Sequence, residues 1–505
     1  MKVAVVGGGV SGLSAVWLLN EHSEHQVDLF ESNDYVGGHS NTVNLIRKQS
    51  LRDEVVRVDT GFIVFNRLTY PNFLRFLETL NIEHIDSDMS FSYKRLSDPT
   101  YEWSGNGLRA LFKGITSLRD LLSQIRMIWD IIRFNCLAID VLDQDDEDLD
   151  VTIDKYLVDH NYSDGFRNHY LLPMVACIWS TPIDKTALLF PMKTLVRFML
   201  NHHLLQIFHQ PQWLTIRNGS RSYVDRILSK LRPESCFKGT KIQSISIDDN
   251  GKISLFDRLG RSFEGYDHII FGSHADQTRQ ILQSSNSDGK FDQQIDLLSD
   301  FQFSKNVAVL HNDISLMPLN REIWASWNYF TGQRKSKPKS FSDCDHNSIA
   351  MESTVSLTYW MNLLQSIPEE KYGPILVTLN PAEPIDQRFI SGQWEYEHAL
   401  YTSKSVKAQS RLSEIQGLSG LSYVGAWTKY GFHEDGFTSA LKLLVRDKYE
   451  LFRVKSPIGL TIRDEKVRPP GLIVRLIIFC IQALFEIFFL ILKVLGSSLG
   501  KTKKS

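Results

Sequence analysis

The stretch MKVAVVGGGVSGLSAVWLL, residues 1–19, decides how the rest of the chain is interpreted. A short apolar run leads into three consecutive glycines, and a second apolar run with helical spacing follows them. Gly7, Gly9 and Gly12 have the G-x-G-x-x-G spacing of a dinucleotide-binding turn. In such a turn the glycines permit a sharp bend, the approach of a pyrophosphate to the backbone, and close packing of helix on strand.

The segments on either side of these glycines provide the context that the motif requires. We expect a strand before them and a helix after them, so that backbone N–H groups of the first helical residues, Val10 and Ser11, bind the pyrophosphate. A second strand, QVDLFES, contains Glu31 near its end, nineteen positions after Gly12, where an acidic side chain binds the ribose hydroxyls. A secretory signal peptide is the alternative, but a triple glycine in mid-segment and the lack of a small-residue cleavage site argue against it.

Composition narrows the function classes. A chain of 505 residues with 43% hydrophobic and 23% charged residues fits two or three globular domains. The net charge of −2 gives no general attraction to nucleic acid. The five cysteines are scattered, which predicts neither a disulfide framework nor a zinc site, and a reducing compartment is the default. The histidines of residues 165–215 match no zinc spacing either, so we expect no metal.

A second glycine pair, Gly37-Gly38, follows Glu31 in the run ESNDYVGGHS. An acid at the end of the second strand and a later Gly-Gly pair form the second half of the flavoprotein fingerprint. The N-terminus thus resembles the superfamily of flavin-containing amine oxidases and phytoene desaturases. The resemblance implies FAD, and because no Cys or His lies in an attachment motif, we expect it to be bound noncovalently. In that family an arginine usually follows the pair and contacts the FAD phosphates, whereas His39 stands here.

A smaller group within this superfamily is more similar still. It consists of predicted NAD/FAD-binding oxidoreductases that in bacteria often accompany cyclopropane-fatty-acid synthases. The run Gly37-Gly38-His39-Ser40 and the run Gly431–Gly436, GFHEDG, carry the resemblance. Gly38 and His39 are therefore expected at the cofactor, and His433 is a candidate proton donor near the flavin. The resemblance also implies an acid at the ribityl chain, for which Asp435 and Gly436 are the candidates.

Two further contacts are expected along the chain. Gly61, which follows Asp59-Thr60 at the end of a predicted strand, permits a close backbone approach beside the isoalloxazine ring. Asp59 is either a functional acid or an acid satisfied by the backbone of the turn. Asn250-Gly251 predicts a hairpin. In the superfamily this hairpin covers the adenine, so a backbone amide near Ile242 would contact the adenine edge.

These segments predict an α/β fold: a Rossmann-type FAD-binding domain with an α+β substrate domain and a C-terminal hydrophobic helix. Apolar residues spaced by three and four predict one long helix over residues 108–136, and a last helix is expected over Thr438 to Leu444. We assign residues 1–90, 215–275 and 420–450 to the FAD-binding domain, 91–214 and 276–419 to the substrate domain, 451–471 to a linker and 472–499 to a membrane-associated helix.

The tail LIVRLIIFCIQALFEIFFLILKVL is long enough to span a bilayer. Its polar residues, Arg475, Gln482, Glu486 and Lys493, are separated by seven, four and seven positions and therefore share one helix face. Such a helix either lies in the membrane interface or crosses the bilayer with its polar stripe against a partner. A buried soluble helix is the third alternative. The end KTKKS also fits a retrieval signal of the endoplasmic reticulum, which acts on the cytosolic side.

The sequence as a whole favours an FAD-dependent oxidoreductase, of oxidase or desaturase type, that acts on an apolar, lipid-like substrate at a membrane, with its catalytic domain in the cytosol. Two alternatives stay open at this point. One is an amine oxidase with a soluble substrate, although no motif places the lysine that is typical of amine oxidases. The other is a noncatalytic flavin-binding scaffold that partners a lipid-modifying enzyme.

Overall fold

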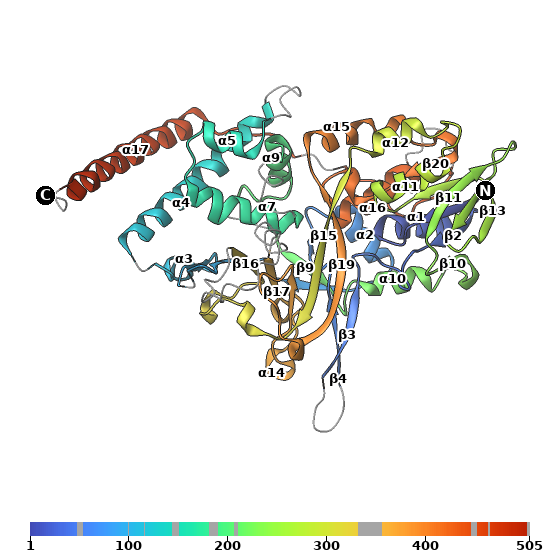
Figure 1. Ribbon diagram of the computed structural model, residues 1–505, viewed down its shortest axis with the longest axis horizontal. Coiled ribbons are helices and arrows are strands. Elements are labelled where there is room, and N and C mark those ends of the chain that lie inside the picture. Colours follow the sequence, from blue (N-terminus) through green and yellow to red (C-terminus); the bar gives the residue numbers. More distant parts are fainter. Residues whose placement is uncertain are drawn as a thin grey trace, which may run out of the picture. The chain divides into compact units, whose positions relative to one another are not determined.

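The computed structural model describes residues 1–47, 54–98, 100–115, 117–143, 151–180, 190–206, 211–331, 356–445, 452–462 and 465–501. The chain forms two compact units, each built from separate segments (Figure 1). The first comprises residues 1–114, 173–190 and 211–463, and the second comprises 115–172, 191–210 and 464–505. The first unit holds both the predicted FAD-binding segments and most of the predicted substrate segments, so the boundary between those two domains stays a prediction.

A parallel five-stranded sheet carries the glycine-rich turn, which confirms the predicted Rossmann-type α/β fold. Its strands, in spatial order, are β10 (Cys236–Phe237), β2 (Gln26–Phe30), β1 (Lys2–Val6), β14 (His268–Phe271) and β20 (Leu421–Tyr423). Every neighbouring pair is parallel. The carboxyl ends of β1 and β14 therefore lie side by side, which is where open α/β sheets bind ligands.

Helices cover this sheet and supply its core. Helix α1 (Val10–His22) is buried along its whole first part, Val10 to Leu19, as expected for a helix that is apolar on every side. It packs against α16 (His433–Val445), and the shared core extends to α2 (Pro71–Thr79) and α10 (Arg221–Leu228). A second cluster lies between the sheet, α11 (Ala275–Ser285) and α12 (Asp292–Leu298).

The predicted hairpin is confirmed. Strands β11 (Ile242–Ile247), β12 (Ile253–Asp257) and β13 (Ser262–Tyr266) form an antiparallel sheet, and Gly251 takes a positive φ of 77° in the first turn. Two smaller antiparallel sheets follow the glycine-rich turn in sequence. One pairs β3 (Thr42–Arg47) with β4 (Glu54–Asp59), and the other has the order β5 (Phe65–Asn66), β9 (Trp213–Ile216), β6 (His84–Ser87).

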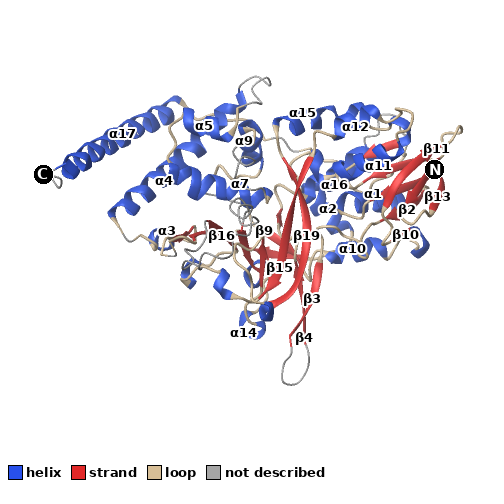
Figure 2. Ribbon diagram, in the orientation of Figure 1, coloured by secondary structure: helices blue, strands red, loops and turns tan. Residues whose placement is uncertain are grey.

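A seven-stranded sheet forms the rest of the first unit (Figure 2). Its order is β19 (Ile390–Leu400), β15 (Gln302–His311), β18 (Leu376–Leu379), β17 (Ser356–Trp360), β16 (Trp327–Thr331), β7 (Phe91–Arg95) and β8 (Glu102–Ser104). All pairs are antiparallel except β16 with β7. Short helices of this unit are α3 (Leu108–Phe112), α7 (Leu172–Trp179), α13 (Met361–Leu364), α14 (Glu369–Tyr372) and α15 (Ser403–Arg411).

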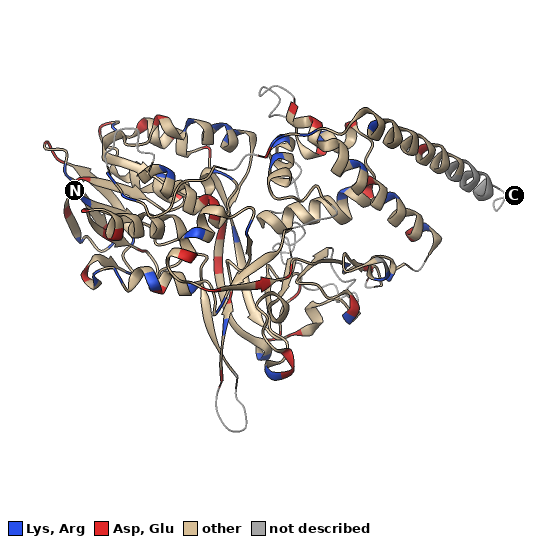
Figure 3. Ribbon diagram, turned by 180° about the vertical axis from the view of Figure 1, so that it is seen from behind, with Lys and Arg blue, Asp and Glu red and all other residues tan. Residues whose placement is uncertain are grey.

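The second unit is helical in its described residues, apart from an isolated bridge between Thr152 and Pro191. Its helices are α4 (Leu118–Leu137), α5 (Ile153–Asp159), α6 (Asp164–Phe166), α9 (Met192–Asn201) and α17 (Leu472–Lys501). Phe134 is fully buried at its centre, with Tyr156, Tyr162 and Phe166 around the ring. Helix α17 is almost free of charged residues along its described length (Figure 3).

Two expectations about helices were wrong. The helix predicted over residues 108–136 is interrupted between α3 and α4. There the backbone of Gly114 packs directly against that of Glu102, so closely that a Cβ at Gly114 would lie 2.4 Å from the Glu102 carbonyl oxygen. A new helix then begins after Ser117, whose side chain caps it. The last helix of the Rossmann fold was expected to begin at Thr438 but begins at His433. His433, Glu434, Asp435 and Gly436 therefore form its first turn.

Candidate cofactor site

The glycine-rich turn interlocks with the neighbouring strand through backbone alone. Gly7 has a φ of +107°, and a Cβ there would lie 2.7 Å from the backbone nitrogen of Ser273. A Cβ at Gly12 would lie 1.9 Å from the carbonyl oxygen of Gly7, and one at Gly272 would lie 2.8 Å from Cα of Gly12. No side chain fits at these contacts. Gly7 and Gly12 thus let β1, α1 and the end of β14 approach each other closely.

Gly9 differs from these two glycines because its surroundings are open. No atom lies within 4 Å of a Cβ built at Gly9, although its φ of −76° would suit other residues. Gly9 is the N-cap of α1, yet no side chain accepts a hydrogen bond from that helix N-terminus, and its first turn has no acidic residue. The backbone N–H groups of Val10 and Ser11 are therefore placed to bind an anion. This is the arrangement that a dinucleotide pyrophosphate requires.

Glu31 follows β2 and holds the glycine-rich turn from the side. Its carboxylate accepts hydrogen bonds from the backbone N–H of Gly8 at 2.7 Å and of Asn33 at 2.8 Å. It is nearly buried, with 7% of its surface exposed. Each carboxylate oxygen has two lone pairs, so a ribose hydroxyl can still be accepted. The predicted ribose contact stays a prediction, but the carboxylate also fixes the turn.

The second glycine pair places His39 next to the same turn. Gly38 has a φ of +56°, and its Cβ position lies 3.1 Å from Cα of Gly9. The His39 ring lies 5.0 Å from the Tyr396 ring and 5.1 Å from the His398 ring. Its Nε2 atom is buried, and no described residue forms a hydrogen bond with it. A buried polar nitrogen without a partner costs free energy, which a bound ligand would recover.

Burial keeps the histidines of this cluster uncharged. It lowers the pKa of His39 well below the ordinary value, and the neighbouring His398, His274 and His433 lower it further. Burial also lowers the pKa of His398 to about 4, with a smaller contribution from His274. His274 is held by the carboxylate of Glu397 at 3.3 Å. His39 and His398 are therefore neutral imidazoles, which donate or accept single hydrogen bonds and bring no charge of their own to the site.

His433, the candidate proton donor, is fixed from two sides. Its Nε2 lies 2.9 Å from Oγ of Ser40, which also contacts the hydroxyl of Tyr223 at 2.6 Å. Its ring stacks on Phe62 with a centroid distance of 3.6 Å. Burial lowers the pKa of His433 to about 3. Its role as a proton donor stays a prediction, and it would act from the neutral ring.

The acids beside His433 stabilise helix ends. The Asp435 carboxylate accepts the backbone N–H of Phe432 at 3.0 Å, and burial raises its pKa to about 6. Glu434 accepts the backbone N–H groups of Asn72 and Phe73 at 3.1 and 2.8 Å, so it satisfies the N-terminus of α2 from another helix. Burial raises the pKa of Glu434 to about 8, although these N–H groups oppose the shift. The expected ribityl contact of Asp435 stays a prediction.

Gly436 and Gly61 are both positions of close contact within the protein. A Cβ at Gly436 would lie 2.7 Å from Val10 Cγ1 and 2.8 Å from Ser11 Oγ, so this glycine lets α16 approach the N-terminus of α1. A Cβ at Gly61 would lie 2.4 Å from the carbonyl oxygen of His39. Both glycines therefore shape the walls around the glycine-rich turn. Their direct contact with a flavin stays a prediction.

Ile242 and Asp59 complete the predicted positions. Ile242 begins β11 and pairs with Asp257, and its contact with an adenine stays a prediction. Asp59 is fully buried and accepts hydrogen bonds from Thr42, from Ser220 and from the amide of Gln365. This arrangement favours the structural interpretation of Asp59. The Asp59 carboxylate joins β3, β4 and the segment before α10, and burial raises the pKa of Asp59 to about 6.

Sequence reasoning missed the aromatic and histidine residues that surround His39 from β19. The Tyr396 hydroxyl forms a hydrogen bond with Thr60 Oγ1 at 2.7 Å and accepts a second one from the side-chain amide of Asn41 at 3.0 Å. Nδ1 of His398 lies 2.8 Å from the side-chain amide nitrogen of Asn306. No motif identifies them, since they lie more than 350 positions after His39. The alternation along β19 was the one available signal, because Tyr396 and His398 are two residues apart and thus share a face.

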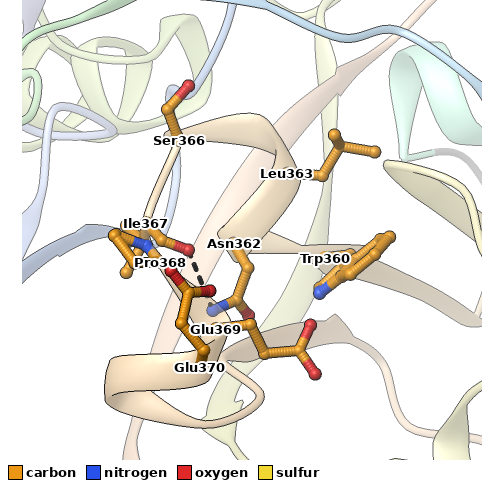
Figure 4. Close-up of a pocket in the computed structure, with 8 residues that line it drawn as sticks. All are labelled: Trp360, Asn362, Leu363, Ser366, Ile367, Pro368, Glu369 and Glu370. Atoms are coloured by element: carbon orange, nitrogen blue, oxygen red, sulfur yellow. Dashed lines mark hydrogen bonds between the residues drawn. The ribbon is translucent and has the colours of Figure 1, made fainter.

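A small surface hollow of about 300 Å³ lies elsewhere, around α13 and α14 (Figure 4). It is lined by Trp360, Asn362, Leu363, Ser366, Ile367, Pro368, Glu369 and Glu370. None of the predicted cofactor residues lines it. The amide of Asn362 in its floor is already used by the carbonyl oxygen of Ile367 at 3.2 Å. We assign no function to this hollow.

Comparison with known proteins agrees with this geometry. The model of the NAD(P)-binding Rossmann-like domain matches residues 5–80. No curated protein matches the sequence significantly. Three solved structures are similar in fold. A CLA-producing fatty acid isomerase from P. acnes has a TM-score of 0.55 at 14% identity and covers 88% of this chain and 98% of its own.

The other two structures are amine oxidases. Cyclohexylamine oxidase from Brevibacterium oxydans IH-35A has a TM-score of 0.54 at 13% identity and covers 87% of this chain and 97% of its own. A putrescine oxidase redesigned in its cofactor binding has a TM-score of 0.56 at 12% identity, with 88% and 99% covered. The chain therefore shares its fold with these two oxidases and the isomerase, which agrees with the resemblance that its sequence motifs indicated.

Proposed function

We propose that this protein is an FAD-dependent oxidoreductase that acts on an apolar, lipid-like substrate at a membrane. The observation that carries the proposal is the uncapped N-terminus of α1, which faces open space at Gly9, whereas Gly7 and Gly12 are closed in by backbone and Gly8 by the side chains of Glu31 and Val36. A Rossmann-like domain with this feature binds a dinucleotide. The second glycine pair and the oxidoreductase neighbours in fold favour FAD over a nicotinamide.

The residues around the turn fit this cofactor. The backbone N–H groups of Val10 and Ser11 would hold the pyrophosphate, Glu31 the ribose, and the amide near Ile242 the adenine edge. The partnerless Nε2 of His39 would donate to or accept from a polar group of the cofactor, in the place where the superfamily has an arginine. FAD, when bound, supplies the hydride-accepting and hydride-donating chemistry. Noncovalent binding remains part of the proposal.

The protein itself would orient the substrate and exclude water. His39, His398 and His433 are uncharged at neutral pH because they are buried, so these three rings add no positive charge to the site. An apolar substrate suits such a site. The fatty acid isomerase of similar fold and the apolar helix α17 support a lipid-like substrate and action at a membrane, with the first unit in the cytosol. The endoplasmic reticulum gains no support, and residues 502–505 lie outside the described residues.

The experiment that tests the proposal begins with the protein stripped of cofactor. Fluorescence titration with FAD, FMN and NAD should give submicromolar binding for FAD alone. The loaded protein is then mixed with lipids and with amines under air, and the absorbance of the flavin and the release of hydrogen peroxide are followed. Bleaching by lipids supports the proposal. Turnover of amines alone would replace it with amine oxidation, and a flavin that no substrate reduces would indicate a scaffold.

A further inference from the structure

The apolar helix of the second unit has a polar stripe whose described members all have partners. Within the described residues, Leu472–Ile491 of α17 is the one stretch long and apolar enough to cross a membrane. Arg475, Gln482 and Glu486 lie on one face of it. A helix that crosses a bilayer alone would have to leave these groups in hydrocarbon. Their actual partners therefore indicate how the helix is placed.

Each of the three groups contacts α4 or the short 3-10 helix that follows it, η1 (Ala138–Asp143). The Arg475 guanidinium donates to both carboxylate oxygens of Asp140 at 2.6 Å. The indole N–H of Trp129 donates to the amide oxygen of Gln482 at 2.7 Å. Arg126 donates to a carboxylate oxygen of Glu486 at 2.9 Å. Two charge pairs and one neutral hydrogen bond thus give every described residue of the stripe a partner.

The order of these pairs shows that α17 runs antiparallel to α4. Residues 475, 482 and 486 meet residues 140, 129 and 126 in turn. Apolar contacts strengthen the same face: the Trp129 and Phe485 rings are stacked 5.6 Å apart at 8°, and Ile478 is 5% exposed. The two helices therefore lie side by side with the polar residues at the edge of their contact, where the Glu486 side chain remains 53% exposed.

Helix α4 is too polar to enter a bilayer with its partner. Asp130 is fully buried and accepts hydrogen bonds from Arg133 at 3.1 Å and from the backbone N–H of Ser163 at 2.9 Å. Arg133 also donates to the carbonyl oxygen of His160 at 2.9 Å. This network ties α4 to the irregular segment between α5 and α6, at His160 and Ser163. If α17 crossed the membrane while paired with α4, the network and that segment would lie in hydrocarbon, where irregular backbone exposed to lipid does not occur.

Apart from the stripe, α17 is apolar and exposed, both on the opposite face and beside the stripe, where Phe479 is 71% exposed. Ile473, Ile477, Leu484 and Ile487 each expose more than half of their surface, with 75% for Ile473. Residues at these spacings lie about half a turn from the stripe. The sequence after Glu486 adds four lysines and no acidic residue. Apolar residues on one face and basic residues at the end are typical of a helix that lies on an anionic bilayer.

We propose that α17 lies in the plane of a phospholipid bilayer surface, with the face of Ile473, Ile477, Leu484 and Ile487 among the acyl chains and the polar stripe held by α4. Over 20 residues the buried line would be about 30 Å long. The protein would then be attached to one leaflet without crossing the membrane. This inference specifies the membrane action in the proposed function and depends on it.

The test measures the depth of single fluorophores along the apolar face. In the full-length protein with its native cysteines replaced by serine, one cysteine at a time is placed at Ile473, at position 480, where Cys480 is native and exposed, at Ile487 or at Ile491. Each variant is labelled with a bimane and bound to vesicles of phosphatidylcholine and phosphatidylglycerol. Lipids with a nitroxide at carbon 5 or carbon 12 of the acyl chain report its depth. A label at Leu259, exposed on the β12–β13 turn of the first unit, is the control.

An in-plane helix predicts the same shallow depth at all four positions, with carbon-5 nitroxides quenching more strongly than carbon-12 nitroxides, and no quenching at the control. A depth that increases toward the middle position and decreases again would overturn the inference in favour of a spanning helix, while leaving membrane action in place. If the protein does not float with vesicles of either composition, both the inference and the membrane part of the proposed function are wrong. Flavin content is read from the absorbance of the same samples, so loss of the cofactor is recognised separately.

Discussion

Replacing Gly9 by alanine should impair cofactor binding while leaving the fold intact. The backbone at Gly9, with φ −76° and ψ −179°, suits alanine, and no atom lies within 4 Å of the new Cβ. Alanine is a poorer N-cap than glycine by about 0.5–1 kcal/mol, but it also removes about 0.4–1 kcal/mol of unfolded-state entropy. The two terms offset each other, so the Tm should change by no more than about 2 °C.

The effect on FAD follows from where the methyl group would lie. It would occupy the space through which a pyrophosphate approaches the N–H groups of Val10 and Ser11. Loss of one hydrogen bond to a charged group costs about 1.5–3 kcal/mol, which corresponds to FAD binding that is about ten to a hundred times weaker. The assay is a fluorescence titration of the cofactor-free protein with FAD, beside a thermal melt of the same preparation.

Gly12→Ala is the matched comparison, because its Cβ would lie 1.9 Å from the carbonyl oxygen of Gly7. We expect this variant to be insoluble or strongly destabilised, because it affects the packing of the protein itself. A Gly9→Ala protein that binds FAD as tightly as the parent would refute the assignment of the α1 N-terminus as the pyrophosphate site. A Gly12→Ala protein with normal stability would refute the packing argument.

Four other outcomes are expected. Gly436→Ala should lower the free energy of unfolding by about 1–3 kcal/mol in urea because the added methyl overpacks α1 against α16, whereas Gly459→Ala, where no atom lies within 4 Å, should not. Above about pH 8, where the Glu434 side chain is a carboxylate, Glu434→Gln should cost about 1–3 kcal/mol, because one amide oxygen replaces two carboxylate oxygens and leaves a backbone N–H of α2 unsatisfied. The pKa of His433 is lowered to about 3 in the fold, so its contribution to stability is complete above about pH 6.5 and is lost as the pH falls toward 3. His433→Phe should therefore reduce the slope of unfolding free energy against pH by about 1.4 kcal/mol per pH unit between pH 4 and 6. An unchanged slope would contradict the burial argument. Arg126→Glu should weaken flotation with anionic vesicles, and the further exchange Glu486→Arg should restore it; failure of the double exchange to rescue would show that the pair does not position α17.

The sequence was sufficient for the Rossmann part of the fold because that part is determined locally. Gly7 and Gly12 fix a turn in which a side chain at either position would collide with backbone, and the apolar runs around them are short, buried strands and a helix that is buried from Val10 to Leu19. The hairpin at Asn250-Gly251 is equally local. Such elements depend on a few neighbouring residues, so pattern and turn chemistry are enough to predict them.

The parts that were not predicted depend on contacts far apart in the chain. The break before α4 depends on close packing of Gly114 against the backbone of Glu102, and the spacing of apolar residues contains no information about that contact. Tyr396 and His398 reach His39 only after β19 has paired with β15 in a sheet of seven strands. Glu434 precedes the candidate acid Asp435 directly, but its role as a cap for α2 depends on packing against a helix residue that lies 361 positions earlier.

The polar stripe of α17 was visible in the sequence as a spacing of seven and four. Its meaning was not, because the partners Asp140, Trp129 and Arg126 lie more than 330 positions earlier. Spacing alone left an interfacial helix and a spanning helix equally open. Contacts within the second unit favour the interfacial arrangement.

The central claim is that the chain binds FAD noncovalently, and an absorbance spectrum tests it most directly. The detergent-purified full-length protein is scanned between 300 and 600 nm, then heated and centrifuged, and the supernatant is scanned and chromatographed. The account predicts flavin bands in the native sample that pass completely into the supernatant and elute as FAD. A folded protein that is colourless and takes up no added FAD, or a yellow pellet with a colourless supernatant, would contradict it.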